Sequence, residues 1–283
     1  MTITVIGATG QQGSAVVNAL LAQNAPVRAA VRDPQGRAAT ELAHRGVELV
    51  VVDLDDQASV SRALEGATAA FAMTTYSGPR GTDGEIDQGS AIAKAADASA
   101  LPYLVYSSVG GAERHTGIPH FESKRRIEEF LLDTGRPVTF LRPTFFMDNL
   151  IGMIDTEAEP GRVELPLPDG VALQMISVRD IGKAAAALLL NRDGAPTSLE
   201  IAGDQITGSQ IAEVVGTHLD RAVKYTEAPL EVLGDDEDRK TMFRWFTDLP
   251  AYRADFAATQ RWVPEVENFA AWVRRSVATT VQA

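Results

Sequence analysis

The stretch that most constrains the fold is TITVIGATGQQG at 2–13, in which an apolar, β-branched run leads directly into Gly7, Gly10 and Gly13. The run predicts a buried strand and the apolar spacing after Gly13 predicts a helix, so the glycines lie at a strand-to-helix turn. There Gly7 permits a tight turn, Gly10 lets a pyrophosphate approach the backbone, and Gly13 lets the helix pack closely on the strand. The helix N-terminus also offers free N–H groups to negative charge. With a second strand predicted at 26–31, the pattern favours a dinucleotide-binding βαβ unit over a merely tight turn.

Composition narrows the class of protein. The chain has 283 residues, 45% of them hydrophobic, which is enough to bury a full core. It contains no cysteine, which excludes disulfides, thiolate metal sites and a cysteine nucleophile, and we expect no metal site. No signal peptide or membrane-spanning run is recognisable, so a cytoplasmic protein with no membrane partner is expected. A net charge of −12 with only short basic runs argues against a nucleic-acid partner.

Strand and helix signals alternate through the first half of the chain, which is the pattern of a parallel sheet covered on both faces. Strands are predicted at 2–6, 26–31, 47–52, 67–73, 102–107 and 137–141. Helices are predicted at 13–23, 37–45, 57–64, 84–99 and 121–134. The expected fold class is therefore α/β, a Rossmann-type doubly wound parallel sheet with a smaller α/β C-terminal lobe.

The alternation loosens after residue 143. Loops rich in Glu, Pro and Gly around short strands are expected at 157–170, helices at 178–191, 207–218 and 267–277, and a further strand at 198–202. Thr207 with Gln210 three residues later predicts a capping box at the start of the second of these helices. We therefore expect an NAD(P)-binding domain at 1–150 and a smaller substrate-binding lobe at 151–283, with parts of 171–203 able to return to the sheet.

The end of the second predicted strand bears on the choice of cofactor. Arg32 follows that strand and Arg37 lies five residues further, and guanidinium groups bind the 2′-phosphate of NADP. Asp33 could instead accept hydrogen bonds from the ribose of NAD, and Arg32 could be an ordinary exposed loop residue. NADP(H) is favoured and NAD(H) remains possible. Asp53 is placed to reach an adenine edge, although the neighbouring Asp55 or Asp56 fits a helix N-cap equally well.

Several motifs taken in order resemble the short-chain dehydrogenase/reductase superfamily, and within it the atypical NmrA-like family. The resemblance covers nearly the whole chain. The matching segments are GATGQQG at 7–13, VRDP at 31–34, VYSSVGG at 105–111, HFESKRRIEEFL at 120–131, LRPTFFMDNL at 141–150 and TMFRWF at 241–246. Classical members of the superfamily use a serine with a Tyr-x-x-x-Lys motif, in which the tyrosine passes a proton to or from the substrate oxygen.

This chain keeps the lysine of that motif and lacks the tyrosine. Lys124 is preceded four residues earlier by His120, and Ser107 lies thirteen residues before His120, at the spacing expected of the catalytic serine. In one interpretation Lys124 holds the nicotinamide ribose, as the resemblance implies, while His120 or a water transfers the proton. In a second, His120 only packs and the protein binds NADP(H) without turnover. In a third, Lys124 merely pairs with Glu128 on a solvated helix face.

Further contacts follow from the glycine turn, from strand ends and from the resemblance. Thr9, Gln11 and Gln12 belong to the glycine turn, and segments after the fourth and sixth strands are expected to border the ligand crevice. The predicted cofactor contacts comprise Gly7, Thr9, Gly10, Gln11, Gln12, Gly13, Arg32, Arg37, Asp53, Leu54, Met73, Thr74, Thr75, Lys124, Pro143, Phe145 and Asn149. The predicted substrate pocket comprises Tyr76, Phe146, Phe243, Trp245 and Phe246, with a packed core as the alternative for the aromatic residues.

Two functions of different class remain open. The retained lysine and the aromatic residues favour an NAD(P)H-dependent reductase acting on a small quinone, enone or polycyclic aromatic compound, including as a biosynthetic tailoring enzyme. The missing tyrosine favours a non-catalytic NADP(H)-binding redox sensor of the NmrA-like type. The corresponding partners are a small aromatic or quinone-like substrate, a second copy in a homodimer, or a regulatory protein.

Overall fold

A seven-stranded parallel sheet forms the larger part of the molecule. The computed structural model describes residues 2–281, and the strand order in this sheet is β11-β6-β5-β4-β1-β2-β3. Every neighbouring pair in it is parallel. Its strands are β1 (Ile3–Ile6), β2 (Val27–Val31), β3 (Glu48–Val51), β4 (Ala69–Met73), β5 (Leu104–Ser107), β6 (Val138–Pro143) and β11 (Ser198–Ile201). The strand order reverses between β1 and β4, which is where a doubly wound sheet binds its ligand.

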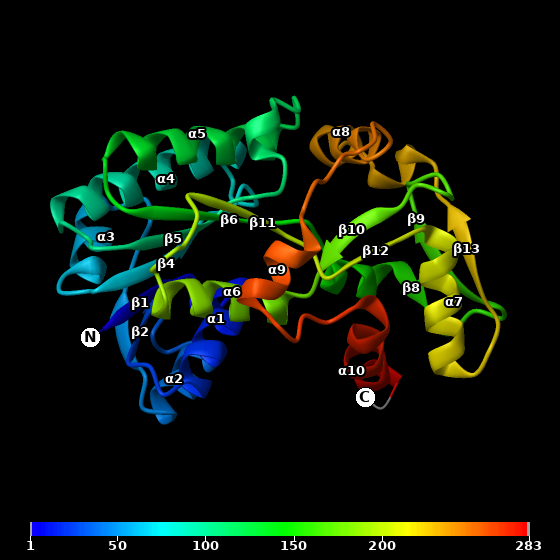
Figure 1. The fold of residues 1–283 in the computed structure, drawn as a ribbon, viewed down its shortest axis with the longest axis horizontal. Coiled ribbons are helices and arrows are strands. Elements are labelled where there is room, and N and C mark those ends of the chain that lie inside the picture. The colour runs from blue at the N-terminus through cyan, green and yellow to red at the C-terminus, as the bar shows by residue number, and fades with distance from the viewer. Residues whose placement is uncertain (1, 282–283) are drawn as a thin grey trace.

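Helices cover both faces of this sheet, so the predicted fold class is confirmed (Figure 1). One face carries α3 (Gln57–Leu64), α4 (Gly81–Ala98) and α5 (Pro119–Asp133). The other carries α1 (Gln11–Ala22), α2 (Arg37–His44) and α6 (Val178–Leu190). Two hydrophobic clusters, one on each side of the sheet, form the core of this part.

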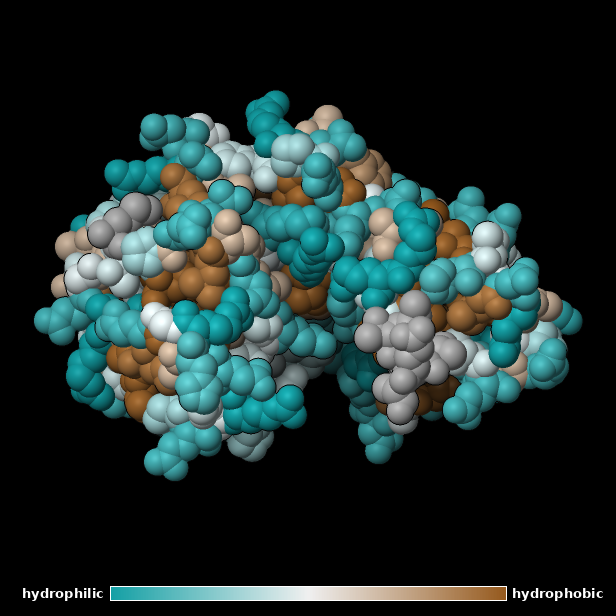
Figure 2. All heavy atoms as spheres, turned by 90° about the horizontal axis from the view of Figure 1, so that it is seen from below, coloured by the Kyte–Doolittle hydropathy of each residue, from teal (hydrophilic) through white to brown (hydrophobic). Residues whose placement is uncertain are grey.

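The smaller part contains two three-stranded sheets, and it lies at the carboxyl edge of the large sheet because β6 and β11 both run directly into it. Its strands are β7 (Phe145–Phe146), β8 (Ile154–Asp155), β9 (Gly161–Leu165), β10 (Leu173–Ile176), β12 (Asp204–Ile206) and β13 (Val223–Glu227). Its helices are α7 (Gly208–Leu219), α8 (Glu237–Trp245), α9 (Phe256–Trp262) and α10 (Phe269–Val281). Short 3₁₀ turns lie at Ala112–Arg114, Met147–Met153 and Leu230–Leu233. Seen from below, the surface is hollowed between the two parts (Figure 2).

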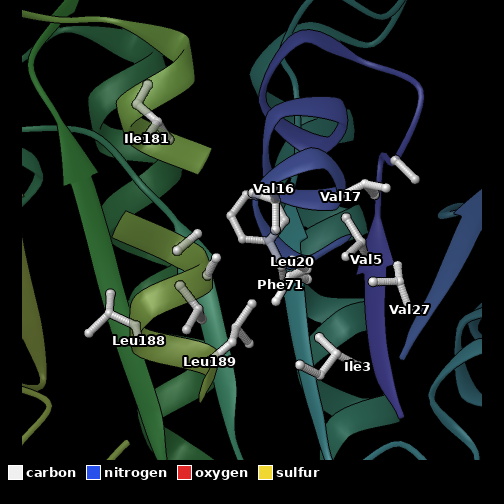
Figure 3. Packing of buried hydrophobic residues seen from close by; sticks show 14 of the residues in the cluster. Ile3, Val5, Val16, Val17, Leu20, Val27, Phe71, Ile181, Leu188 and Leu189 are labelled. Carbon is white, nitrogen blue, oxygen red and sulfur yellow. The ribbon is translucent and has the colours of Figure 1, made fainter. Parts of the chain in front are cut away.

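Helices α1 and α6 pack closely against each other in the larger part. Val16, Val17 and Leu20 of α1 meet the sheet residues Ile3, Val5 and Phe71, while Ile181, Leu188 and Leu189 of α6 complete the same cluster (Figure 3). Gly182 of α6 permits this approach, since a Cβ atom there would lie 2.5 Å from the backbone carbonyl group of Ala15. The second half of the chain therefore supplies part of the core of the first.

Most predicted elements are present, with boundaries shifted by a few residues. The capping box of α7 is confirmed, because the Thr207 side chain accepts from the backbone of Gln210 and the Gln210 side chain accepts from that of Thr207. Strand β9 lies within 157–170, where short strands between loops were expected, but strands β7, β8, β10, β12 and β13 and helices α8 and α9 were not predicted. These strands are two to five residues long, too short for a clear alternation of apolar and polar residues. Among residues 2–281, no helix is long and apolar enough to cross a membrane.

Candidate nicotinamide-cofactor site

The glycine turn between β1 and α1 has the geometry of a phosphate cradle. Gly7 adopts φ +76°, and a Cβ atom at Gly13 would lie 2.0 Å from the carbonyl oxygen of Gly7, so α1 packs against the turn as closely as backbone allows. Gly10 is different, because a Cβ atom there would come only within 3.4 Å of the same oxygen. Gly10 is exposed and is the N-cap of α1, where no side chain accepts from the first helical N–H groups. The N–H groups at the N-terminus of α1 are thus free to bind an anion.

Residues from neighbouring strand ends converge on this turn. Met73, at the end of β4, lies against Gly7, since a Cβ atom on Gly7 would come within 3.2 Å of its sulfur. The hydroxyl of Ser107, at the end of β5, donates to Oε1 of Gln12 at 2.5 Å. Thr9 and Gln11 are exposed beside the turn. Three predicted site residues, Met73, Ser107 and Gln12, therefore do meet at the switch point.

The end of β2 presents a free cation. Arg32 is exposed, and its guanidinium makes no hydrogen bond or ion pair with any other residue of the described range 2–281. Arg37 is 94% exposed at its side chain and is paired with Glu41 at 3.0 Å. The Asp33 carboxylate accepts from the backbone N–H of Gln35 at 2.9 Å, which closes a local turn. Of the two arginines, Arg32 is the one whose guanidinium has no competing partner.

The aspartates that follow β3 have different roles. Asp53 is exposed, and its side chain accepts from the backbone N–H of Asp55 at 3.0 Å. Asp56 is the N-cap of α3, accepting from the N–H of Ala58 at 2.9 Å, which confirms the capping alternative for that residue. Leu54 is half-buried between them.

Lys124 is buried at the centre of a polar cluster rather than displayed on a solvated face. Its Nζ donates to the carbonyl oxygen of Thr74 at 2.9 Å and to the Thr74 hydroxyl at 3.1 Å, and it lies 3.0 Å from Oε1 of Glu85. The Tyr106 hydroxyl is 3.4 Å away and the Ser107 carbonyl oxygen 3.5 Å. Lys124 thus joins the ends of β4 and β5 to the helix α5.

The alternative in which Lys124 pairs with Glu128 is wrong. Glu128 is itself buried and forms a bidentate ion pair with Arg142 of β6, in which Nε and Nη2 of the arginine lie 2.9 and 2.5 Å from the carboxylate oxygens. Lys124 faces the other way, into the cluster with Glu85, which is 0% exposed. A lysine this deep keeps its charge only when a carboxylate compensates it.

The electrostatics of the cluster keep Lys124 charged and Tyr106 neutral. Burial acts to lower the pKa of Lys124, but its interactions with Tyr106 and Glu85 outweigh burial and the pKa is raised. Burial raises the pKa of Tyr106 to about 12, despite the opposing effect of Lys124. The Tyr106 hydroxyl is 2.7 Å from that of Thr74, whose hydroxyl also lies 3.2 Å from Glu85. At neutral pH Lys124 is therefore an ammonium group and Tyr106 a neutral phenol.

His120 lies at the edge of this cluster, held by a residue from the smaller part. Its ring is stacked on Tyr76, with centroids 4.8 Å apart, and its Nδ1 contacts Oδ1 of Asp238. The backbone N–H of His120 donates to Oδ2 of the same carboxylate at 2.8 Å. Burial, and then the nearby Asp238, raise the pKa of Tyr76. The structure therefore brings together two predicted residues, His120 and Tyr76, with a third that was not predicted.

The aromatic residues of α8 pack into a core instead of roofing an open pocket. Phe243 and Phe246 are each 1% exposed and belong to the hydrophobic cluster of the smaller part. Their burial matches the packed-core alternative. Trp245 is only half-buried and reaches the larger part, where its ring meets that of Phe121 at 5.4 Å and covers Gly111. Only Trp245 of these three keeps an accessible side.

The remaining predicted residues lie around the same edge of the sheet. Pro143 and Phe145 are buried where β6 runs into β7, and Phe146 is half-buried. Thr75 and Asn149 are exposed. Next to Ser107, the hydroxyl of Ser108 is buried and makes no hydrogen bond within the described residues. A buried hydroxyl without a partner beside a candidate site is a candidate ligand contact.

Glu85 and Asp238 are the main site residues that sequence reasoning missed. Glu85 lies 39 positions before Lys124 on a different helix, and Asp238 lies 118 positions after His120. Nothing in the sequence around Asp238 marks it as a contact of His120. A buried lysine does predict some carboxylate partner, without saying which.

The site lies at the carboxyl ends of the strands of a doubly wound sheet and contains a glycine turn and a buried lysine. These features define a class of protein that binds a nicotinamide dinucleotide. The chain matches the NmrA-like family over residues 1–276 and belongs to that family. It is 29% identical over 230 residues to an NAD(P)H azoreductase of Xenophilus azovorans, covering 81% of this chain and 78% of that protein.

Two solved structures have the same fold. An NADPH-dependent quinone oxidoreductase of Escherichia coli, complexed with NADPH, superposes with a TM-score of 0.81 at 22% identity, covering 96% of this chain and 99% of that one. NmrA, a negative transcriptional regulator solved in complex with NAD, superposes with a TM-score of 0.84 at 20% identity, covering 99% and 96%. The same fold is therefore found in a reductase and in a regulator.

Proposed function

We propose that this protein is an NAD(P)H-dependent oxidoreductase that reduces a small quinone, enone or polycyclic aromatic compound. The observation that carries the proposal is Lys124, a charged side chain buried at the ends of β4 and β5 and compensated by Glu85 at 3.0 Å. Such a costly arrangement beside a phosphate cradle is typical of a functional site rather than of a solvated helix face.

The residues at the switch point fit a dinucleotide. The uncapped start of α1 and the exposed Gly10 would accept the pyrophosphate, and Arg32 would pair with a 2′-phosphate, which favours NADP(H) over NAD(H). Lys124 would hold the nicotinamide ribose. When bound, the reduced nicotinamide would supply the hydride.

The chain's own residues would then position the substrate and move a proton. Lys124 and the ends of β4 and β5 would orient the reacting groups, and the buried hydroxyl of Ser108, which has no hydrogen-bond partner within the described residues, is a candidate contact. His120, set at the edge of the same cluster, would donate the proton that balances the hydride; for a quinone, water can serve instead. The half-buried rings of Tyr76 and Trp245 offer flat apolar surface to an aromatic substrate.

The relatives support a reductase without fixing the substrate. The azoreductase resembles this chain over most of its length, and the quinone oxidoreductase shares its fold. A second function is that of an NADP(H)-binding regulator, and one observation favours it. The ammonium of Lys124 is already surrounded by acceptors within the protein, at Thr74 and Glu85. The fold shared with the regulator NmrA is consistent with it.

Turnover decides between these functions. The purified protein is mixed with NADPH or NADH, and cofactor absorbance is followed with a panel of quinones, enones and azo compounds. Substrate-dependent oxidation of the cofactor is expected for at least one compound. If the protein binds NADPH and oxidises it with none of the panel, the regulator becomes the better proposal.

Two variants then test the assigned roles. Lys124→Ala should weaken cofactor binding and turnover together, because it removes the group that positions the ribose. His120→Phe should leave the Kd for NADPH within about twofold and lower kcat by about 100-fold, the usual contribution of a general acid. Unchanged turnover in His120→Phe would mean that water provides the proton and that Lys124 acts alone.

A further inference from the structure

Helix α5 receives its N-terminal cap from a residue of another helix. The first N–H groups of a helix have no partner inside it, and Ile118, at the N-cap position of α5, has no side-chain acceptor to offer. Asp238 of α8 takes that place, because its Oδ2 accepts from the backbone N–H of His120 at 2.8 Å. The other oxygen of the same carboxylate contacts Nδ1 of the His120 ring. One carboxylate thus holds both the backbone and the side chain of one residue.

The surroundings leave this arrangement little freedom. The side chains of His120 and Asp238 are only 13% and 16% exposed. Tyr76 is stacked on one face of the imidazole, and Phe121 meets it edge-on at 4.7 Å. Asp236 caps the start of α8 by accepting from the N–H of Arg239 at 2.9 Å, which fixes the turn that carries Asp238.

We propose that Asp238 is a positioning residue, which fixes the His120 ring so that its Nε2 is the nitrogen available for proton transfer. A carboxylate can only accept, so the ring nitrogen that faces it carries a proton. To act as the donor, the ring must also carry a proton on Nε2; it gives up that proton and keeps the one on Nδ1, which Asp238 holds. The inference rests on the proposed function, since it gives His120 its orientation for that reaction. It also makes α8 of the smaller part a contributor to the site.

Asp238→Asn separates orientation from capping. An asparagine has one acceptor and one donor; with its oxygen kept on the backbone N–H of His120, its NH₂ group faces Nδ1 and favours the opposite tautomer. The cap should therefore survive, with the melting temperature within about 2 °C, while kcat falls at least about 10-fold and the Kd for NADPH stays within about twofold. Asp238→Ala loses the cap as well, and its melting temperature should fall.

Glu237→Gln is the matched control. It makes the same change of charge at the neighbouring position, where the side chain pairs with Lys240 and does not contact His120. Its kcat should stay within about twofold of the parent. An equal loss of kcat in Glu237→Gln and Asp238→Asn would mean that the effect is one of general charge, and would overturn the inference.

A double-mutant cycle shows whether Asp238 acts through His120. In a His120→Phe background the backbone N–H remains, so Asp238→Ala should still lower the melting temperature. Neither substitution at Asp238 should lower kcat further there, because the ring that it positions is absent. A further loss of kcat in that background would contradict a role through His120.

A spectroscopic readout keeps the inference testable even if no substrate is found. The chain has four histidines, so ¹⁵N-labelled histidine gives few signals, and His120→Phe assigns the one that disappears. The parent should show Nδ1 of His120 protonated, and Asp238→Asn should show the proton moved to Nε2. The same tautomer in both proteins would leave Asp238 as a helix cap only and overturn the inference. Absent turnover with the expected tautomer change would instead count against the proposed reaction.

Discussion

Lys124 and Glu85 form the most costly pair in the site. Taking both charges out of water costs several kcal/mol for each ion, and the carbonyl and hydroxyl oxygens of Thr74 offset part of that cost by accepting from the ammonium. Lys124 was identified in the sequence as the lysine of the family motif, and His120 was then singled out because it lies one helical turn before Lys124. Its partner could not be identified in this way, because Glu85 is brought beside it only by the packing of α4 against α5.

Arg32 is expected to set the preference for NADPH. Its guanidinium is exposed and unpaired within residues 2–281, so a 2′-phosphate would gain a charge-assisted contact of about 1.5–3 kcal/mol. Arg32→Ala should weaken NADPH binding by about 10- to 150-fold and leave NADH within about twofold, as measured by fluorescence titration. Arg37→Ala is the control, and its smaller effect follows from the competing pair with Glu41. Equal affinities for the two cofactors in the parent would contradict this assignment.

Gly10 and Gly13 should respond differently to added side chains. Gly10 has extended backbone, with φ −85° and ψ 174°, and room for a Cβ atom, so Gly10→Val should fold. The valine side chain would fill the space through which the pyrophosphate approaches the backbone. The affinity for NADPH should therefore fall at least about 100-fold in the same titration. Gly13→Ala should instead lower the melting temperature, because its Cβ atom would lie 2.0 Å from the Gly7 oxygen. Normal NADPH binding by a stable Gly10→Val protein would remove the phosphate role.

At the scale of the element, α1 and α6 depend on one glycine. A Cβ atom at Gly182 would lie 2.5 Å from the backbone of Ala15, and backbone cannot rotate away as a side chain can. Gly182→Ala should therefore reduce the free energy of unfolding by about 1–3 kcal/mol, measured by urea denaturation. Gly78→Ala is the control, since nothing lies within 4 Å of a Cβ atom there. An unchanged midpoint in Gly182→Ala would mean that the helices separate at little cost.

Elements whose signals are local were predicted, and those fixed by distant contacts were not. The six strands and five helices of the first half follow from periodicity and turn residues, and the α7 capping box follows from Thr207 and Gln210 alone. Strand β7, in contrast, is two residues long and exists because it pairs with β10. In the site, Gly7, Gly10 and Gly13 were identified by their spacing, whereas Asp238 and Glu85 reach it through tertiary packing.

At the scale of the whole molecule, the chain leaves the large sheet after β6 and later returns to it. β11 pairs with β6 as the seventh strand, and α6 packs on α1. Seven apolar residues of α6 are buried, so their contribution to the core comes from beyond residue 150. The units that fold together therefore need not follow the division at residue 150 that the sequence suggested.

Fragments test this dependence. A fragment of residues 1–150 exposes the face of α1 that α6 covers, including Val16 and Leu20, and leaves β6 as an open edge. It should show no cooperative thermal transition by circular dichroism. A fragment of residues 1–206 keeps α6 and β11 and should melt cooperatively, at a lower temperature than the full chain because it lacks the helices that cover the smaller sheets. A cooperative transition in the shorter fragment, together with NADPH binding, would establish 1–150 as an independently folding domain. Helix α6 would then not be needed for that domain to fold.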